Sequence, residues 1–174
     1  MFDRVVVPVD GSPGSFRAVV AGSRLAASNR ARLEVLTVVD PPADRRAEEA
    51  HLRERLGELG ALPCPPEPVV LAGDLASHAV EKYLTDGPPT QLVMSSTGRG
   101  RSAAVLGSVA EELLSAGLGS IVVVGPHADP NRIAAIDVLV TLDGSKLSER
   151  ALDVAAQWCA TTGGRPWVVR VLAA

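Results

Sequence analysis

Short, continuously apolar segments alternate along this chain with longer amphipathic ones. Arg4 to Val9 (RVVVPV) is the first such run, and Leu33 to Val39 (LEVLTVV) is the second. Parallel strands that are covered on both faces read as continuous apolar runs, and each needs a helical crossover to reach the next strand. The alternation therefore predicts an α/β fold, with βαβ units around a buried parallel sheet.

Turn and capping residues mark the limits of the expected elements. Ser12 followed by Pro13 predicts the start of a helix, and Asp74 is expected to cap another. The stretch 61–68 (ALPCPPEP) is expected to be a connecting loop, because its prolines lack backbone donors. The other expected strands are 69–72, 91–95 and 120–124, and the other expected helices are 44–59 and 108–116.

A repeated segment divides the chain. VVVPVDGS (Val5 to Ser12) returns 133 residues later as VLVTLDGS (Val138 to Ser145), and a helix and a strand are predicted after it at 148–160 and 167–172. This repeat predicts a first domain over residues 1–128 and a partial, incomplete second repeat of strand-helix-strand form over 129–174. Because so short a unit cannot form a sufficient core, its apolar faces must dock within this chain or on a partner, or the sequence is a fragment of a longer two-domain protein.

Composition narrows the functional class. The chain is 47% hydrophobic with a formal net charge of -3 and only five aromatic residues, which disfavours a nucleic-acid surface. No apolar run approaches the roughly 18 residues of a membrane span, and no secretory leader is recognisable. We therefore expect a cytoplasmic protein that binds neither membrane nor nucleic acid. The three histidines are scattered and make no metal or triad constellation, and the two distant cysteines do not indicate a disulfide framework. The presence of a metal site is left open.

Asp10-Gly11-Ser12 follows the first strand directly. In an open parallel sheet, residues just beyond the carboxyl ends of the strands line the ligand crevice where the strand order reverses. A carboxylate there can accept hydrogen bonds from a ribose or an adenine amino group. The alternative is that Asp10 and Ser12 serve only the turn and the helix cap.

A glycine-spaced segment, TGRGRSAAVLGS, follows the fourth strand (Thr97 to Ser108). Gly98, Gly100 and Gly107 would let backbone N–H groups approach an anion, and a helix N-terminus after Gly107 favours phosphate. Arg99 and Arg101 add forked donors. The segment is not a P-loop, because Gly-Lys-Ser/Thr is missing, and a flexible turn is the alternative.

Several motifs together resemble the universal stress protein family: VVVPVDGS, VLTVVDP, AGD at 72–74, LVMSSTGRGR, and LGSVAEELL leading to GSIVVVGP. The resemblance covers nearly all of residues 1–128, and the partial repeat resembles the start of the second domain of a tandem member. It implies an open, doubly wound five-stranded parallel sheet of order 3-2-1-4-5 with helices on both faces.

The nucleotide-binding branch of that family uses Gly, two residues, Gly, nine residues, then Gly-Ser/Thr to bind ATP. Here Ser95 stands at the first glycine position, and eight residues separate Gly98 from Gly107. The resemblance implies that Asp10 contacts ribose or adenine, that the Val38 backbone reads the adenine edge, and that Met94 packs on the base. The full set of nucleotide-binding residues that it implies is Pro8, Val9, Asp10, Gly11, Ser12, Val38, Met94, Ser95, Gly98, Arg99, Gly100, Gly107, Ser108 and Val109, with Gly98, Arg99, Gly107, Ser108 and Val109 holding phosphates.

These features favour a stress-response regulatory protein that binds ATP or ADP with Mg²⁺ and is at most a slow ATPase. Ser95 and the short loop motivate an alternative, a nucleotide-free interaction module that acts by dimerisation or partner binding. A phosphotransfer or adenylylating enzyme is supported by fold analogy alone. The apolar edge strand Ser120 to Gly125 is expected to mediate a homodimer, unless the second repeat does so.

Overall fold

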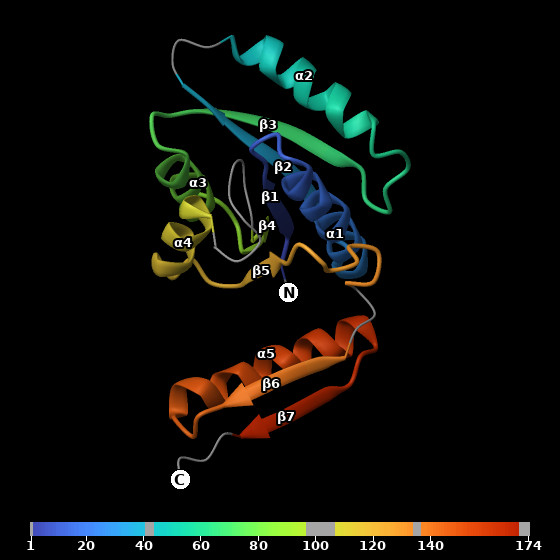
Figure 1. The fold of residues 1–174 in the computed structure, drawn as a ribbon, viewed down its shortest axis with the longest axis vertical. Helices are drawn as coiled ribbons and strands as arrows, with labels where there is room; N and C mark the ends of the chain where they lie inside the picture. The colour runs from blue at the N-terminus through green and yellow to red at the C-terminus, as the bar shows by residue number, and fades with distance from the viewer. Residues whose placement is uncertain (1, 41–43, 97–106, 134–136, 171–174) are drawn as a thin grey trace. The chain divides into compact units, whose positions relative to one another are not determined.

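The computed structural model describes residues 2–40, 44–96, 107–133 and 137–170. The chain forms two compact units, Met1–Asn131 (unit 1) and Arg132–Ala174 (unit 2). Figure 1 shows the helices and strands of each unit.

Unit 1 is an α/β structure with one five-stranded sheet of order β3-β2-β1-β4-β5 (Figure 1). Every neighbouring pair of strands is parallel. The expected order is therefore confirmed. The elements are β1 (Arg4–Pro8), α1 (Pro13–Asn29), β2 (Arg32–Val39), α2 (Arg45–Gly57), β3 (Pro66–Ala72), α3 (Ala76–Thr85), β4 (Thr90–Ser95), α4 (Ser108–Ser115) and β5 (Ile121–Val124).

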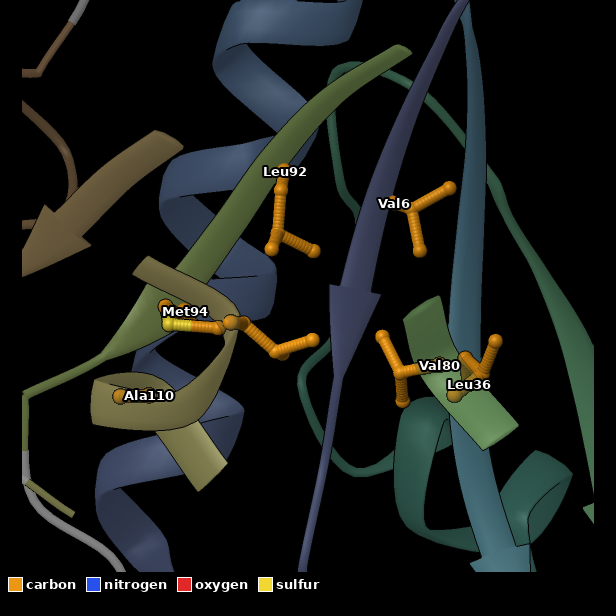
Figure 2. Close-up of a cluster of buried hydrophobic side chains, with 7 residues drawn as sticks. Val6, Leu36, Val80, Leu92, Met94 and Ala110 are labelled. Atoms are coloured by element: carbon orange, nitrogen blue, oxygen red, sulfur yellow. The ribbon is translucent and has the colours of Figure 1, made fainter. Parts of the chain in front are cut away.

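The two faces of the sheet are buried by different helices. On one face Gly22 of α1 lies against Val7 and Val5 of β1. On the other face, side chains from β1, β2 and β4 pack with side chains from α3 and α4 in one apolar cluster (Figure 2). Its buried members are Val6, Leu36, Val80, Leu92, Met94, Ala110 and Leu113.

The third strand begins earlier than the sequence indicates. β3 starts at Pro66, so the expected loop at 61–68 ends sooner and two prolines lie inside the strand. The reason is topological: β3 is an edge strand that pairs only with β2, with Pro66 opposite Leu33 and Pro68 opposite Val35. An edge strand tolerates proline where the missing N–H would face away from the partner strand.

Two helix starts differ in how they are capped. Ser12 caps α1 as expected, because its Oγ accepts the Ser15 N–H at 3.2 Å. The prediction that Asp74 caps α3 is wrong: the N-cap is Leu75, which makes no side-chain capping bond. Helix α3 begins one residue later than the sequence suggests, so the Asp74 carboxylate does not occupy the capping position.

A buried ion pair connects β1 and β2 near the amino-terminal end of β1. Arg4 Nη1 donates to Glu34 Oε2 at 3.0 Å, and both side chains are almost fully buried. Tyr83 Oη also donates to Glu34 Oε2 at 3.0 Å, and Arg4 donates to the Tyr83 carbonyl and to Thr90 Oγ1. Burial, together with the bond to the Glu34 carboxylate, raises the pKa of Tyr83. The network joins β1, β2, α3 and β4.

Unit 2 contains β6 (Val138–Leu142), α5 (Lys146–Thr162) and β7 (Pro166–Arg170). β6 and β7 form a two-stranded parallel sheet. Ser145 caps α5 by accepting the Ser148 N–H on its Oγ at 3.1 Å. The expected strand-helix-strand unit is therefore present.

Candidate functional site

A cleft of about 500 Å³ opens at the carboxyl ends of β1, β2 and β4 in unit 1. This is the point where the strand order reverses, because β1 lies between β2 and β4. In doubly wound sheets this position is the usual ligand site. The cleft is also within the normal size range for small-molecule sites.

Nine of the predicted site residues line this cleft: Pro8, Val9, Asp10, Val38, Met94, Ser95, Gly107, Ser108 and Val109. Gly11 and Ser12 are not among the lining residues and form the turn that follows Asp10. Gly98, Arg99 and Gly100 lie outside the residues that the structure describes.

The turn after β1 orients the first carboxylate. Asp10 Oδ1 accepts the Ser12 N–H at 3.0 Å, and Gly11 between them has φ +82°, in the left-handed region that favours glycine. Ser15 Oγ then donates to the Ser12 carbonyl at 2.8 Å. This bond fixes the orientation of the Asp10 carboxylate, and a carboxylate can accept several hydrogen bonds at once.

The opposite wall of the cleft is a helix N-terminus. Gly107 is the N-cap of α4 and makes no side-chain capping bond, while its own N–H donates to the Ser96 carbonyl at 3.1 Å. The first N–H groups of α4 therefore have no side-chain acceptor from the cap. Backbone N–H groups at a helix start, with the helix dipole behind them, form a favourable environment for an anion.

Between these walls the cleft is lined by apolar side chains from β2, α3 and β4. Leu36, Val80 and Met94 are buried members of the core cluster that also line the cleft, and Val38 packs against them. Figure 2 shows Leu36, Val80 and Met94 among the side chains of this cluster. The ionisable side chains in the described lining are Asp10 and Glu48, both carboxylates. The described lining is therefore mainly apolar, with two acidic residues, the hydroxyl-bearing residues Ser15, Thr37, Ser95 and Ser108, and no lysine or arginine.

Sequence reasoning missed several lining residues, among them Leu36, Thr37, Ala76 and Glu48. Leu36 and Thr37 could have been found, since they precede Val38 on the same strand. Glu48 could not, because it belongs to a highly charged helix whose pattern indicates a solvent-exposed face.

The family of the protein is established by comparing its sequence with known protein families. A sequence model of the universal stress protein family matches residues 1–125. The chain belongs to the universal stress protein family. Within this universal stress protein, the match covers the whole sheet of unit 1 and every described residue of the cleft. A search of curated proteins found no similar sequence.

Solved structures have the same fold. A universal stress protein from Archaeoglobus fulgidus is 23% identical with a TM-score of 0.73, over 98% of this chain and 68% of that chain. The universal stress protein UspA from Lactobacillus plantarum is 23% identical with a TM-score of 0.60, over 71% of this chain and 97% of that one. A universal stress protein solved in complex with cAMP is 26% identical with a TM-score of 0.56, also over 71% and 97%.

Among the described residues, no three His, Cys, Asp or Glu side chains gather in a way that could hold a metal ion. Within the same residues, no helix is long and apolar enough to cross a membrane.

Proposed function

We propose that this universal stress protein binds an adenine nucleotide, ATP or ADP, with Mg²⁺ in the cleft of unit 1. Nucleotide occupancy then modulates its association with partners in a stress-response role, with at most slow ATP hydrolysis. The observation that supports this most strongly is the order of groups across the cleft: an apolar wall at β2, a carboxylate at the end of β1, and a helix N-terminus after β4. That order matches base, ribose and phosphates.

Each group has a role in this proposal. The Val38 backbone reads the adenine edge, Met94 packs on the base, and the Asp10 carboxylate accepts from ribose hydroxyls. The N–H groups at Ser108 and Val109 donate to phosphate oxygens, together with Gly98 and Arg99 from the segment outside the described residues. Mg²⁺ is held by one or two carboxylates and by the nucleotide's own phosphates, and it neutralises their charge. With Asp10 at the ribose, Mg²⁺ would be held chiefly through the phosphates.

The cAMP-bound relative supports the same ligand class, since cAMP is an adenine nucleotide. The support is for a base and ribose site rather than for a triphosphate.

The internal repeat supplies a matched control for testing the proposal. Asp10 and Asp143 follow equivalent strands, and each accepts the N–H of a serine two residues later. We expect Asp10→Ala to weaken ATP binding by about tenfold or more, because a charge-assisted hydrogen bond is lost. Asp143→Ala should leave it unchanged. Calorimetry in Mg²⁺ buffer measures both, and mass spectrometry of small molecules released from the purified protein identifies any retained nucleotide.

A nucleotide-free interaction module is the second candidate. Ser95 at the first glycine position favours it, and so does Glu111, an acidic residue in the first turn of α4 that would oppose an anion at that helix start. This candidate predicts no bound nucleotide, no heat on adding ATP, and unchanged partner binding in Gly107→Val. Retained ATP or ADP would exclude it.

For assembly, we propose a homodimer through the β5 edge or through unit 2, with unit 2 as the start of a tandem second domain. β5 is the edge strand of the sheet on the β4 side and exposes Val123. β6 and β7 expose Leu139, Trp167 and Val169. Sedimentation of the full chain with Val123→Lys, and separately with Leu139→Lys, tests which surface is used. A lysine on the surface that mediates assembly should produce monomers, and one on the other surface should change nothing.

A further inference from the structure

The two edges of β6 differ in their pairing. In unit 1 the equivalent strand, β1, pairs with β2 on one edge and with β4 on the other. In unit 2, β6 pairs with β7, and no other described strand pairs with it. The Val138 N–H donates to the Arg165 carbonyl at 2.9 Å, so alternate residues from Val138 onward direct their backbone groups to β7. The backbone groups of Leu139 and Thr141 are therefore directed to the free edge.

One flank of α1 shows what covers this edge in unit 1. Gly22 of α1 lies against β1, and the Ser23 hydroxyl bonds to the backbone of Cys64, just before β3. The residue on the other side of Gly22, Ala21, is therefore directed to β4, against which α1 packs. The fully buried residues on this flank are Ala18, Ala21 and Leu25.

The corresponding flank of α5 is uncovered. The equivalent residues, 133 positions later, are Ala151, Val154 and Trp158. Ala151 is exposed, Val154 is 59% exposed and Trp158 is half-buried. Leu147, one turn before Ala151, is 74% exposed. An apolar helix flank and a free strand edge thus form the surface that β4 covers in unit 1.

Unit 2 has little core of its own to compensate for this exposure. Among its described residues, the buried apolar side chains are Ile133, Val140 and Ala155. Units of this size usually need a disulfide, a metal or oligomerisation to be stable. Covering the free edge and the α5 flank would supply the missing burial.

We propose that a second copy of this chain covers this surface, with the two β6 edges paired antiparallel about a twofold axis. Antiparallel pairing lets the outward N–H and C=O groups of Leu139 and Thr141 bond to the same groups of the other copy. A twofold contact needs a patch that is complementary to itself, and a strand edge meets this requirement. The inference rests on the homodimer of the proposed function and selects unit 2 over β5 as its interface.

The same axis brings the two α5 helices together on one face of a four-stranded sheet. Each α5 packs on its own β6 and β7. The two helix axes are therefore about two strand spacings apart, roughly 10 Å. Packed helices lie about 8–10 Å apart, so the two α5 flanks meet at packing distance. The small side chain of Ala151 permits this approach, and Leu147 and Val154 fill the contact.

Sedimentation velocity of the full chain over a series of concentrations tests the proposal. We expect the wild-type protein to form dimers and Ala151→Lys to raise the dimer Kd by about a hundredfold or more, because lysines from both copies would meet without counter-charges. Ala151 is exposed within one chain, so circular dichroism should be unaltered. In Trp167→Phe, Trp158 is the remaining tryptophan, and its emission should shift to the red as dilution separates the copies.

The matched control is Ala156→Lys, at another exposed alanine of α5. Ala156 is equivalent to Ser23 and lies on the opposite flank, so this variant should keep the wild-type Kd. Val123→Lys on β5 should keep it too. An unchanged Kd in Ala151→Lys, or monomers in Ala156→Lys, would overturn the β6 interface. Monomers in Val123→Lys would also overturn it and assign the homodimer to β5. A wild-type protein that stays monomeric would overturn the interface and the homodimer together.

Discussion

The β1–α1–β2 segment of unit 1 and the β6–α5–β7 segment of unit 2 have the same local structure and opposite burial. Val5 pairs with Leu33 and Val138 with Pro166, so equivalent positions are 133 residues apart in both strands. Val6 and Leu36 are fully buried, yet their equivalents Leu139 and Val169 are 62% and 45% exposed. In unit 1, α3 and α4 cover this face. Local sequence therefore determines the strand-helix-strand unit, while burial depends on elements that follow it.

The same comparison explains a change of chemistry at one pair of positions. Arg4 and Glu34 form the buried ion pair of unit 1. Their equivalents are Asp137 and Trp167, where the indole Nε1 donates to Asp137 Oδ2 at 3.1 Å. Trp167 is half-exposed. A charged network is thus used where four elements meet, and an exposed contact is used in unit 2, whose described elements are β6, α5 and β7.

The largest expected effect comes from breaking the buried pair. Glu34→Ala leaves the Arg4 guanidinium buried without its counter-charge, and we expect a loss of about 3–5 kcal/mol in the free energy of unfolding. Urea unfolding followed by circular dichroism measures this loss. Trp158 and Trp167 are the only tryptophans and both lie in unit 2, so fluorescence recorded in parallel reports unit 2 alone.

Asp137→Ala is the matched change in unit 2, and it should leave the unfolding of unit 1 unaltered. A loss under 1 kcal/mol for Glu34→Ala would mean that water or a rearranged side chain compensates Arg4, and that the pair is not what joins the four elements.

A close helix-sheet contact gives the second expected effect. A Cβ added to Gly22 would lie 2.6 Å from Val7 Cγ2, and Val7 is fully buried with a stiff β-branched side chain. We expect Gly22→Ala to lose about 1–2 kcal/mol, because overpacking outweighs the gain of about 1 kcal/mol in helix propensity. In a Val7→Ala background, which is itself destabilised by the lost burial, Gly22→Ala should cost less than it does in the wild-type protein, because the clash is removed.

Unit 2 has Ala155 at the equivalent position, where it is buried. Ala155→Gly should also destabilise, by about 1 kcal/mol, through helix propensity. If Gly22→Ala stabilised unit 1 instead, α1 would have to sit farther from β1 than the structure places it.

These contacts show what the sequence could predict. Continuous apolar runs and the Ser12-Pro13 start are local signals, and the strands, the α1 cap and the fold class were predicted from them. The Arg4–Glu34 pair, the Gly22 approach and the position of Glu48 join segments far apart in sequence, and no local pattern encodes them. The early start of β3 was missed for a similar reason: proline at 66 and 68 is acceptable only because β3 is an edge strand.

Removing a helix N-cap should have a smaller effect on stability, and the effect should differ between the two units. Ser12 and Ser145 make the same bond to the N–H three residues later, at 3.2 and 3.1 Å, but Ser12 is buried and Ser145 is exposed. We expect Ser12→Ala to lose more of the roughly 0.5–2 kcal/mol typical of a lost N-cap than Ser145→Ala does. Hydrogen exchange of the first turns of α1 and α5 measures each locally. Equal losses would show that burial does not strengthen this cap.

The smallest expected effect is a loss of stability of unit 2 at low pH. The Ser145 N–H donates to Asp143 Oδ1 at 2.8 Å, and this bond, with the Ser145 and Ser148 side chains, lowers the pKa of Asp143 to about 2. An unfolded aspartate has a pKa near 3.9. The unfolded chain therefore binds the proton first, so the stabilisation is complete above about pH 4 and is lost as the pH falls toward 2. Tryptophan fluorescence of unit 2 between pH 5 and 2 should follow this loss, and Asp143→Asn should reduce the dependence and leave the part due to Asp137, whose pKa is also lowered by its bond to Trp167. An unchanged acid transition in Asp143→Asn would assign it to other carboxylates.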